Sequence, residues 1–182
     1  MSSRRAVFLD RDGVLNHAIV KNGKPYPPAT LADLTIVPDA PMALNALKGA
    51  GFLLLVVTNQ PDVARGVASR DTVEKIHSVL REKLPLDDIF VCFHDDMDEC
   101  GCRKPRPGLL NEAAAKYDID LLTSYLIGDR WRDVEAGARA GCRTVLIDYG
   151  YREKGPAESP GASVLSLREA AEWILNQTKT QD

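Results

Sequence analysis

Two aspartates separated by a single residue follow the first apolar segment of the chain. Residues 6–9 are predicted to form a buried strand, and Asp10 and Asp12 lie in the turn that leaves it, just before Gly13. Because open α/β sheets bind ligands beyond the carboxyl ends of their strands, both carboxylates are expected at the mouth of one crevice. Neighbouring carboxylates can act as nucleophiles, proton carriers or ligands of a cation, although their spacing alone shows only that they lie close together. An exposed turn that contains two aspartates is the simpler alternative.

Four further side chains that commonly bind metals lie between residues 92 and 102. They form a Cys-x-His pair, Cys92 and His94, and a Cys-x-Cys pair, Cys100 and Cys102. Three thiolates and one imidazole satisfy a tetrahedral Zn²⁺ ion, and four protein ligands leave no open position, so the loop is predicted to hold a structural zinc. In a cytosolic chain this clustering favours metal over disulfides. The alternative is a set of unrelated reduced cysteines, and Cys142, distant in sequence, is predicted to be a small core residue.

Polar residues also follow the later predicted strands. Thr58 and Asn59 come directly after the second strand, Asp129 follows the fourth, and Lys104 lies in a basic loop among prolines. Loops at the same end of a parallel sheet meet in space, so these side chains are expected near the first two aspartates. Mg²⁺ suits an all-oxygen ligand set of this kind. Each signal alone is also typical of an ordinary turn or a solvated lysine.

Strands and helices alternate along the whole chain. This alternation predicts a three-layer, Rossmann-like α/β fold with a mostly parallel sheet and helices on both faces, formed by a single domain over residues 1–182. Asp39 and Asp71 are expected to cap two helices, and the tail from residue 176 is expected to fray. Residues 16–34 are expected to form a long loop, either a substrate-facing flap or a surface connection. The predicted strands cover residues 6–9, 52–57, 89–92, 124–127 and 144–147, and the predicted helices cover residues 39–49, 71–84, 109–117, 133–140 and 167–175.

The composition is ordinary for a soluble globular protein. The 182 residues are 45% hydrophobic and 27% charged, and the formal net charge of −3 gives no global attraction to nucleic acid or to an anionic membrane. No apolar run approaches the length of a membrane-spanning helix, and the apolar segment behind the basic start is too short for a signal peptide. The chain is therefore expected in the cytoplasm, as a monomer without nucleic-acid or membrane partners.

Four stretches, in order along the chain, resemble the signatures of the haloacid dehalogenase-like phosphatases. The resemblance implies that Asp10 is the nucleophile that forms an aspartyl-phosphate, and that Asp12 is first the general acid and then the general base. It also implies that Thr58 holds a phosphoryl oxygen and that Lys104 balances charge in the transition state. The four stretches are Asp-Arg-Asp-Gly-Val at residues 10–14, Thr-Asn at residues 58–59, Lys104, and Gly-Asp at residues 128–129.

The same resemblance implies a catalytic Mg²⁺ ion. In this family pattern Asp10, Asp129 and the backbone carbonyl of Asp12 bind the ion. Asp133 lies four residues after Asp129 and is either a water-mediated ligand or a favourable charge at a helix N-terminus, and the second interpretation is favoured.

The metal-binding loop resembles a smaller branch of this family. The pattern Cys-x-His…Cys-x-Cys-Arg-Lys-Pro is similar to heptose-1,7-bisphosphate 7-phosphatases and histidinol-phosphate phosphatases, which lack a large cap domain and hold zinc in this loop. Residues 58–60 and 63–66 are closer to the heptose enzymes, whereas residues 61–62 and 20–28 depart from them. The short spacing inside the cysteine motif also occurs in histidinol-phosphate phosphatases. The resemblance implies substrate contacts from Asn59, Gln60, Arg65, Arg103 and Arg130.

The sequence therefore predicts a cytosolic, Mg²⁺-dependent phosphatase with a structural zinc loop at residues 92–102. Its expected partner is a small phosphorylated metabolite. A heptose bisphosphate from the synthesis of lipopolysaccharide or related glycan precursors is the leading substrate, and histidinol phosphate or another sugar phosphate is the alternative. A different class of function, a non-catalytic zinc-stabilised binding module, would be indifferent to the loss of Asp10. Phosphoryl transfer to an acceptor other than water is a third alternative.

Overall fold

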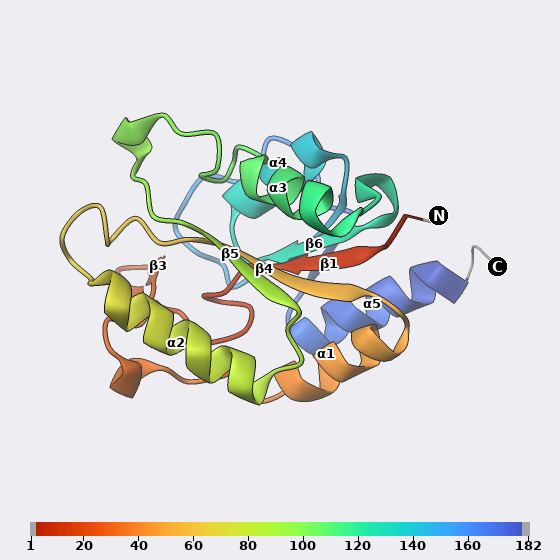
Figure 1. Cartoon of the computed structure of the whole chain (residues 1–182), viewed down its shortest axis with the longest axis horizontal. Helices are drawn as coiled ribbons and strands as arrows, with labels where there is room; N and C mark the ends of the chain where they lie inside the picture. The colour runs from red at the N-terminus through yellow and green to blue at the C-terminus, as the bar shows by residue number, and fades with distance from the viewer. Residues whose placement is uncertain (1–2, 180–182) are drawn as a thin grey trace.

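A six-stranded sheet forms the centre of the molecule, which the computed structural model describes from residue 3 to residue 179 (Figure 1). In spatial order the strands are β5 (Asp88–Cys92), β4 (Leu53–Asn59), β1 (Ala6–Leu9), β6 (Tyr125–Gly128), β7 (Arg143–Ile147) and β8 (Ala162–Val164). All neighbouring strands of this sheet are parallel, and β1 lies between β4 and β6. The carboxyl ends of the central strands therefore meet at one edge of the sheet.

Helices cover both faces of the sheet (Figure 1). The first face carries α1 (Ala40–Gly49), α2 (Arg70–Lys83) and α5 (Leu167–Lys179), and the second carries α3 (Gly108–Tyr117) and α4 (Trp131–Ala140). Side chains alternate between the two cores, because Val7 and Leu9 of β1 pack on the first face whereas Phe8 packs on the second. Burial on both faces explains why the central strands β1, β4 and β6 are apolar up to their carboxyl ends. The predicted three-layer α/β fold is confirmed.

The long segment predicted as a loop contains regular structure. β2 (Ile19–Lys21) and β3 (Lys24–Tyr26) form an antiparallel hairpin, followed by the 3-10 helix η1 (Leu31–Asp33). The hairpin turn consists of Asn22 and Gly23, with φ values of 53° and 75°, as a type I′ turn requires. The Asn-Gly pair was the available signal, but strands of three residues contain too little apolar periodicity to be recognised. The edge strand β8 was missed for the same reason.

One of the two predicted helix caps and part of the predicted tail are wrong. Asp39 occupies the predicted N-cap position of α1, but its side chain makes no capping hydrogen bond, and its Oδ2 instead accepts one from the backbone N–H of Arg168 in α5. The N-cap of α2 is Ser69, whose Oγ accepts from the backbone N–H of Thr72. Residues 176–179 continue α5 as helix, and residues 180–182 lie outside the described part of the chain. The cap of α2 was assigned to Asp71 because several polar residues near the start of this helix are suitable caps.

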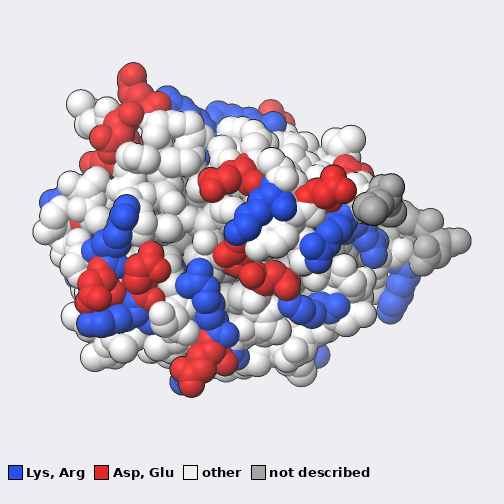
Figure 2. All heavy atoms as spheres, viewed as in Figure 1, with Lys and Arg blue, Asp and Glu red and all other residues white. Residues whose placement is uncertain are grey.

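The surface carries charges of both signs. On the face shown in Figure 2, acidic and basic side chains are interspersed, in keeping with the small formal net charge of −3. Between residues 3 and 179, no helix combines the length and the apolar composition that crossing a membrane requires.

Close packing of α4 against the sheet gives a test of the fold. A Cβ atom at Gly137 would collide with the methyl group of Thr144 and press on Leu126, so Gly137→Ala should lower the free energy of unfolding by about 1–3 kcal/mol. Gly49 at the end of α1 has open space around it, and Gly49→Ala should instead raise stability by up to about 1 kcal/mol. Urea unfolding measures both. Equal effects of the two substitutions would contradict the packing of α4 described here.

Candidate active site

The candidate site lies where the loops after the central strands meet. Asp10 follows β1, and its backbone N–H donates to Ile127 of β6 over 2.9 Å. Asp129 follows β6, and Thr58 lies at the end of β4. The cavity at this edge has a volume of about 240 Å³, and Asp10, Asp12 and Asp129 are among its lining residues. Within residues 3–179, no separate cap domain covers it; the hairpin β2–β3 and the loop after β5 lie at the same end of the sheet (Figure 1).

A buried lysine joins two of the carboxylates. The ammonium group of Lys104 donates to Asp10 Oδ1 over 2.9 Å, to Asp133 Oδ1 over 2.6 Å and to the backbone carbonyl of Val57 over 2.7 Å. Burial by itself would lower the pKa of Lys104, but the adjacent carboxylates of Asp10 and Asp133 raise it above its ordinary value. Lys104 is therefore a cation at neutral pH, as its predicted role requires.

The carboxylates around Lys104 are crowded and incompletely paired. Asp10, Asp129 and Asp133 each offer an oxygen, and these oxygens lie within 4.8 Å of one another. Burial and the charge of Asp133 raise the pKa of Asp10 to about 6, against the opposing charge of Lys104. Burial and the two neighbouring carboxylates raise the pKa of Asp129 well above its ordinary value. In the described residues neither oxygen of Asp129 has a hydrogen-bond partner of good geometry, so this donor set fits a bound cation.

Two glycines allow these side chains to approach so closely. Gly13 has a φ value of 87°, and a Cβ atom there would collide with the carboxylate of Asp129. A Cβ atom at Gly128 would collide with the side chain of Asp133. The glycines beside the aspartates in both sequence motifs are therefore required by the geometry of the site.

Asp133 also begins the helix that follows. Its Oδ2 accepts a hydrogen bond from the backbone N–H of Arg130, three residues earlier, at the N-terminus of α4. This contact agrees with the favoured interpretation of Asp133 as a charge at a helix N-terminus.

Asp12 is held by a network that the sequence did not reveal. Arg11 is completely buried, and its Nε and Nη2 donate to the two oxygens of Asp12, each over 3.0 Å. Asn16 donates to Asp12 Oδ1, and Nη1 of Arg11 lies 3.2 Å from Nε2 of His77 on α2. In the sequence, the only local indication of this network was the arginine between the two aspartates of the Asp-x-Asp motif.

Gln60, predicted as a substrate contact, lies behind the site. It donates to Asp12 over 2.8 Å and to Thr58 over 2.9 Å, and it is not among the residues that line the cavity.

The outer part of the cavity is lined by arginines that already have carboxylate partners. Arg65, Arg103 and Arg130, which were predicted as substrate contacts, are joined there by Arg132, which was not predicted. Asn59 also lines the cavity, and its side chain both donates to and accepts from the backbone of Lys104. The ion pairs are Arg65–Asp95, Arg103–Asp96, Arg130–Glu153 and Arg132–Asp96.

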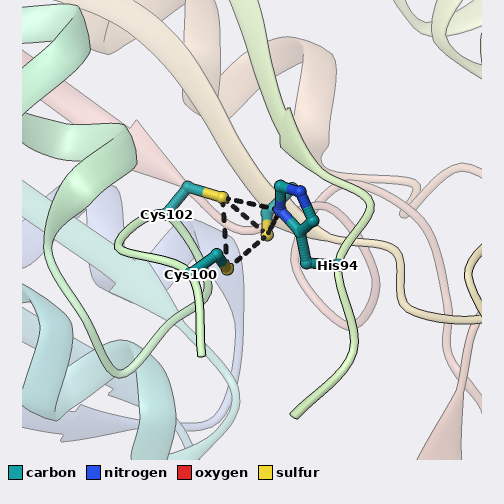
Figure 3. A group of neighbouring side chains, drawn as sticks. His94, Cys100 and Cys102 are labelled. Carbon is teal, nitrogen blue, oxygen red and sulfur yellow. Dashed lines mark hydrogen bonds between the residues drawn. The ribbon is translucent and has the colours of Figure 1, made fainter. Parts of the chain in front are cut away.

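The cysteine loop forms a compact cluster (Figure 3). The side chains of His94, Cys100 and Cys102 point toward one another, and Cys92 joins them from the end of β5. Sγ of Cys92 lies 3.7 Å from Sγ of Cys100, and Nδ1 of His94 lies 3.2 Å from Sγ of Cys102. The four ligand atoms lie within 4.8 Å of one another and have the donor chemistry of a structural zinc site. Sγ of Cys92 and Sγ of Cys102 are 2.9 Å apart, closer than the roughly 3.8 Å between two thiolates at tetrahedral zinc. Cys142 is buried elsewhere in the core, as predicted.

The neutral histidine behind Asp12 predicts a pH effect on stability. Burial, and then the charge of Arg11, lower the pKa of His77 from 6.5 to about 3. As the pH falls, His77 is therefore protonated in the unfolded chain before it is protonated in the folded protein. Stability should therefore fall as the pH falls below 6.5. Replacing His77 with glutamine, which accepts the same hydrogen bond but does not titrate, should reduce the loss between pH 7 and pH 5 by about 2 kcal/mol.

Urea unfolding at the two pH values measures this difference. The exposed His17 provides the matched control, because His17→Gln also removes an imidazole but leaves the contact between His77 and Arg11 intact. The same pH dependence in the parent and in His77→Gln would show that His77 is not held neutral.

Comparisons with known proteins agree with this geometry. A family model described as HAD-hydrolase-like, where HAD denotes haloacid dehalogenase, matches residues 101–170. The chain is 35% identical to a D-glycero-β-D-manno-heptose-1,7-bisphosphate 7-phosphatase of Bordetella bronchiseptica, over 95% of this chain and 99% of that protein. It is 32% identical to a D-glycero-α-D-manno-heptose-1,7-bisphosphate 7-phosphatase of Photorhabdus laumondii, over 85% and 88% of the two chains.

A solved structure has a similar fold. The D,D-heptose 1,7-bisphosphate phosphatase of B. bronchiseptica, crystallised with magnesium and phosphate, superposes with a TM-score of 0.77 at 29% identity. The superposition covers 95% of this chain and 99% of that one.

Proposed function

Because the chain belongs to the haloacid dehalogenase-like phosphatases, we propose that it removes the 7-phosphate from a D-glycero-D-manno-heptose 1,7-bisphosphate. The relatives named above carry this activity, and they match the chain over almost its whole length. The observation that carries the proposal is the convergence of Asp10, Lys104 and Asp129 at the carboxyl edge of the sheet, beside the cavity. A substrate of this class belongs to the synthesis of lipopolysaccharide or related glycan precursors.

Asp10 and Asp129, with the backbone carbonyl of Asp12, would hold a Mg²⁺ ion. Between residues 3 and 179, neither oxygen of Asp129 has a hydrogen-bond partner of good geometry, which supports this assignment. When bound, Mg²⁺ supplies the positive charge that lets a phosphate dianion approach buried carboxylates and that polarises a phosphoryl oxygen.

The side chains of this site divide the reaction into two steps. Lys104 fixes Oδ1 of Asp10, which leaves the other oxygen to attack phosphorus and form an aspartyl-phosphate while the bond to the leaving oxygen breaks. Asp12 gives its proton to that leaving alcohol. Water then attacks the same phosphorus, Asp12 accepts the proton of the water, and the bond from Asp10 to phosphorus breaks, which releases inorganic phosphate.

Thr58 and Lys104 stabilise the phosphoryl group during both steps. Gln60 donates to Oγ1 of Thr58, so the hydroxyl proton of Thr58 is directed to an oxygen of the phosphoryl group. The ammonium of Lys104 places its charge beside Asp10, where negative charge gathers in the transition state.

A structural zinc bound by Cys92, His94, Cys100 and Cys102 would order the rim of the cavity. The loop between these ligands carries Asp95 and Asp96, and these two aspartates pair with the rim arginines. Four protein ligands close the coordination sphere, so the ion has a structural and not a catalytic role. We also propose one domain over residues 1–182 and a monomeric state. We propose a cytoplasmic location because the cysteines form no disulfide and reduced thiols persist in that compartment.

A phosphate-release assay tests the function. The protein with Mg²⁺ should release phosphate from heptose 1,7-bisphosphate with a higher kcat/KM than from sugar monophosphates or histidinol phosphate. Asp10→Asn should lower this rate on the order of a thousandfold or more while leaving the folded structure intact, because the nucleophile is lost. Equal activity over the whole panel would contradict the heptose substrate, and an unchanged rate in Asp10→Asn would contradict the catalytic mechanism.

Elemental analysis tests the zinc loop. Protein purified with metals present should contain about one zinc per chain, and Cys102→Ala should lose most of it and unfold at a lower temperature. The matched control is Cys142→Ala, which removes a buried thiol outside the cluster and should retain the zinc. Zinc-free parent protein, or equal zinc loss in both variants, would contradict the assignment.

A further inference from the structure

The hairpin β2–β3 carries a lysine into the wall of the active-site cavity. Lys24 and Tyr26 lie two residues apart on β3, so their side chains leave the same face of the hairpin, and both line the cavity. A segment distant in sequence holds the hairpin turn in place, because the backbone N–H of Arg152 donates to the carbonyl of Gly23 over 2.8 Å. The side chain of Arg152 also packs so closely that a Cβ atom at Gly23 would collide with it. The position of Lys24 is therefore set by the fold.

Lys24 differs from every other basic side chain that lines the cavity. The four arginines there each have a carboxylate partner, whereas no ion pair or hydrogen bond joins the ammonium of Lys24 to any group between residues 3 and 179. An exposed ammonium at the edge of a cavity is free to bind an anion without first breaking an ion pair. Its three donors and flexible stem suit an oxyanion that approaches from solvent.

We propose that Lys24 binds the second, non-reacting phosphate of the substrate. This inference rests on the proposed function, because it takes the substrate to be a sugar bisphosphate whose 7-phosphate lies at Asp10. Asp10 and Asp129 form the buried floor of the cavity and Lys24 lies at its exposed rim, so one phosphate reaches the nucleophile while the other meets the lysine. Lys24 is in this assignment a specificity-determining residue that selects bisphosphates over monophosphates.

The contact should affect binding more than chemistry. The non-reacting phosphate carries the same charge in the ground state and in the transition state, so the lysine stabilises both equally. Its loss should therefore raise KM and leave kcat nearly unchanged. A substrate that lacks the second phosphate should not respond.

Steady-state kinetics on two substrates test the assignment. For heptose 1,7-bisphosphate, Lys24→Ala should raise KM about tenfold with kcat within about twofold, whereas for heptose 7-phosphate both constants should stay near those of the parent. Lys24→Arg should restore most of the lost affinity. Lys21→Ala is the matched control, since Lys21 pairs with Lys24 across the hairpin, lies over the ring of Tyr26 at 5.9 Å, and is not among the cavity-lining residues.

A binding measurement separates this inference from the proposed function. Calorimetry with the Asp10→Asn variant, which does not turn over, should show about tenfold weaker binding of heptose 1,7-bisphosphate when Lys24→Ala is added, and no change with Lys21→Ala. Equal effects of the two lysine substitutions, or equal effects on both substrates, would overturn the role of Lys24. Absence of phosphate release by the parent protein would instead overturn the proposed function. The calorimetric comparison of bisphosphate binding with and without Lys24→Ala would still test the role of Lys24.

Discussion

Buried negative charge at the carboxyl edge of the sheet is the constraint on which the rest of this structure depends. Asp10, Asp129 and Asp133 offer oxygens within 4.8 Å of one another, and the ammonium of Lys104 contacts two of these three residues. A buried carboxylate without a counter-charge is unfavourable, because the protein interior solvates it poorly. The single positive charge of Lys104 does not neutralise three carboxylates. The remaining negative charge makes this site suited to a divalent cation and to the phosphate that such a cation attracts.

The surrounding elements keep this unfavourable cluster in place. Central strands deliver Asp10 and Asp129 to neighbouring positions, and Gly13 and Gly128 leave the space that the carboxylates occupy. Asn59 clamps the backbone of Lys104, so the lysine cannot withdraw from the site without breaking two hydrogen bonds. Behind the site, Arg11 holds Asp12 and is itself held by a neutral histidine. The reacting groups are thus positioned by rigid elements with little freedom to relax.

The buried carboxylates and the rim of the cavity come from different parts of the molecule. The carboxylates lie at strand ends, whereas the rim is built from the cysteine loop and the β2–β3 hairpin. Asp95 and Asp96 in that loop pair with Arg103, which directly follows the loop, and with Arg65 and Arg132 from two other segments, which links the cysteine loop to the shape of the cavity. Loops can change without disturbing the sheet, so related enzymes can keep one reaction and exchange their substrates.

The sequence by itself determined the fold class of this protein, and it indicated the carboxylates, the lysine and the Cys/His cluster that the structure brings together. Apolar runs ending in Asp, Thr or Gly-Asp indicate parallel strands whose ends converge, and thiols and imidazole indicate zinc from their chemistry alone. Only the tertiary structure decided which side chains are neighbours. Gln60 contacts Asp12, Arg11 reaches His77 over 66 residues of sequence, and Arg65 meets Asp95 over 30. Local periodicity cannot encode such contacts, because they depend on how α2 and the loops pack against the sheet.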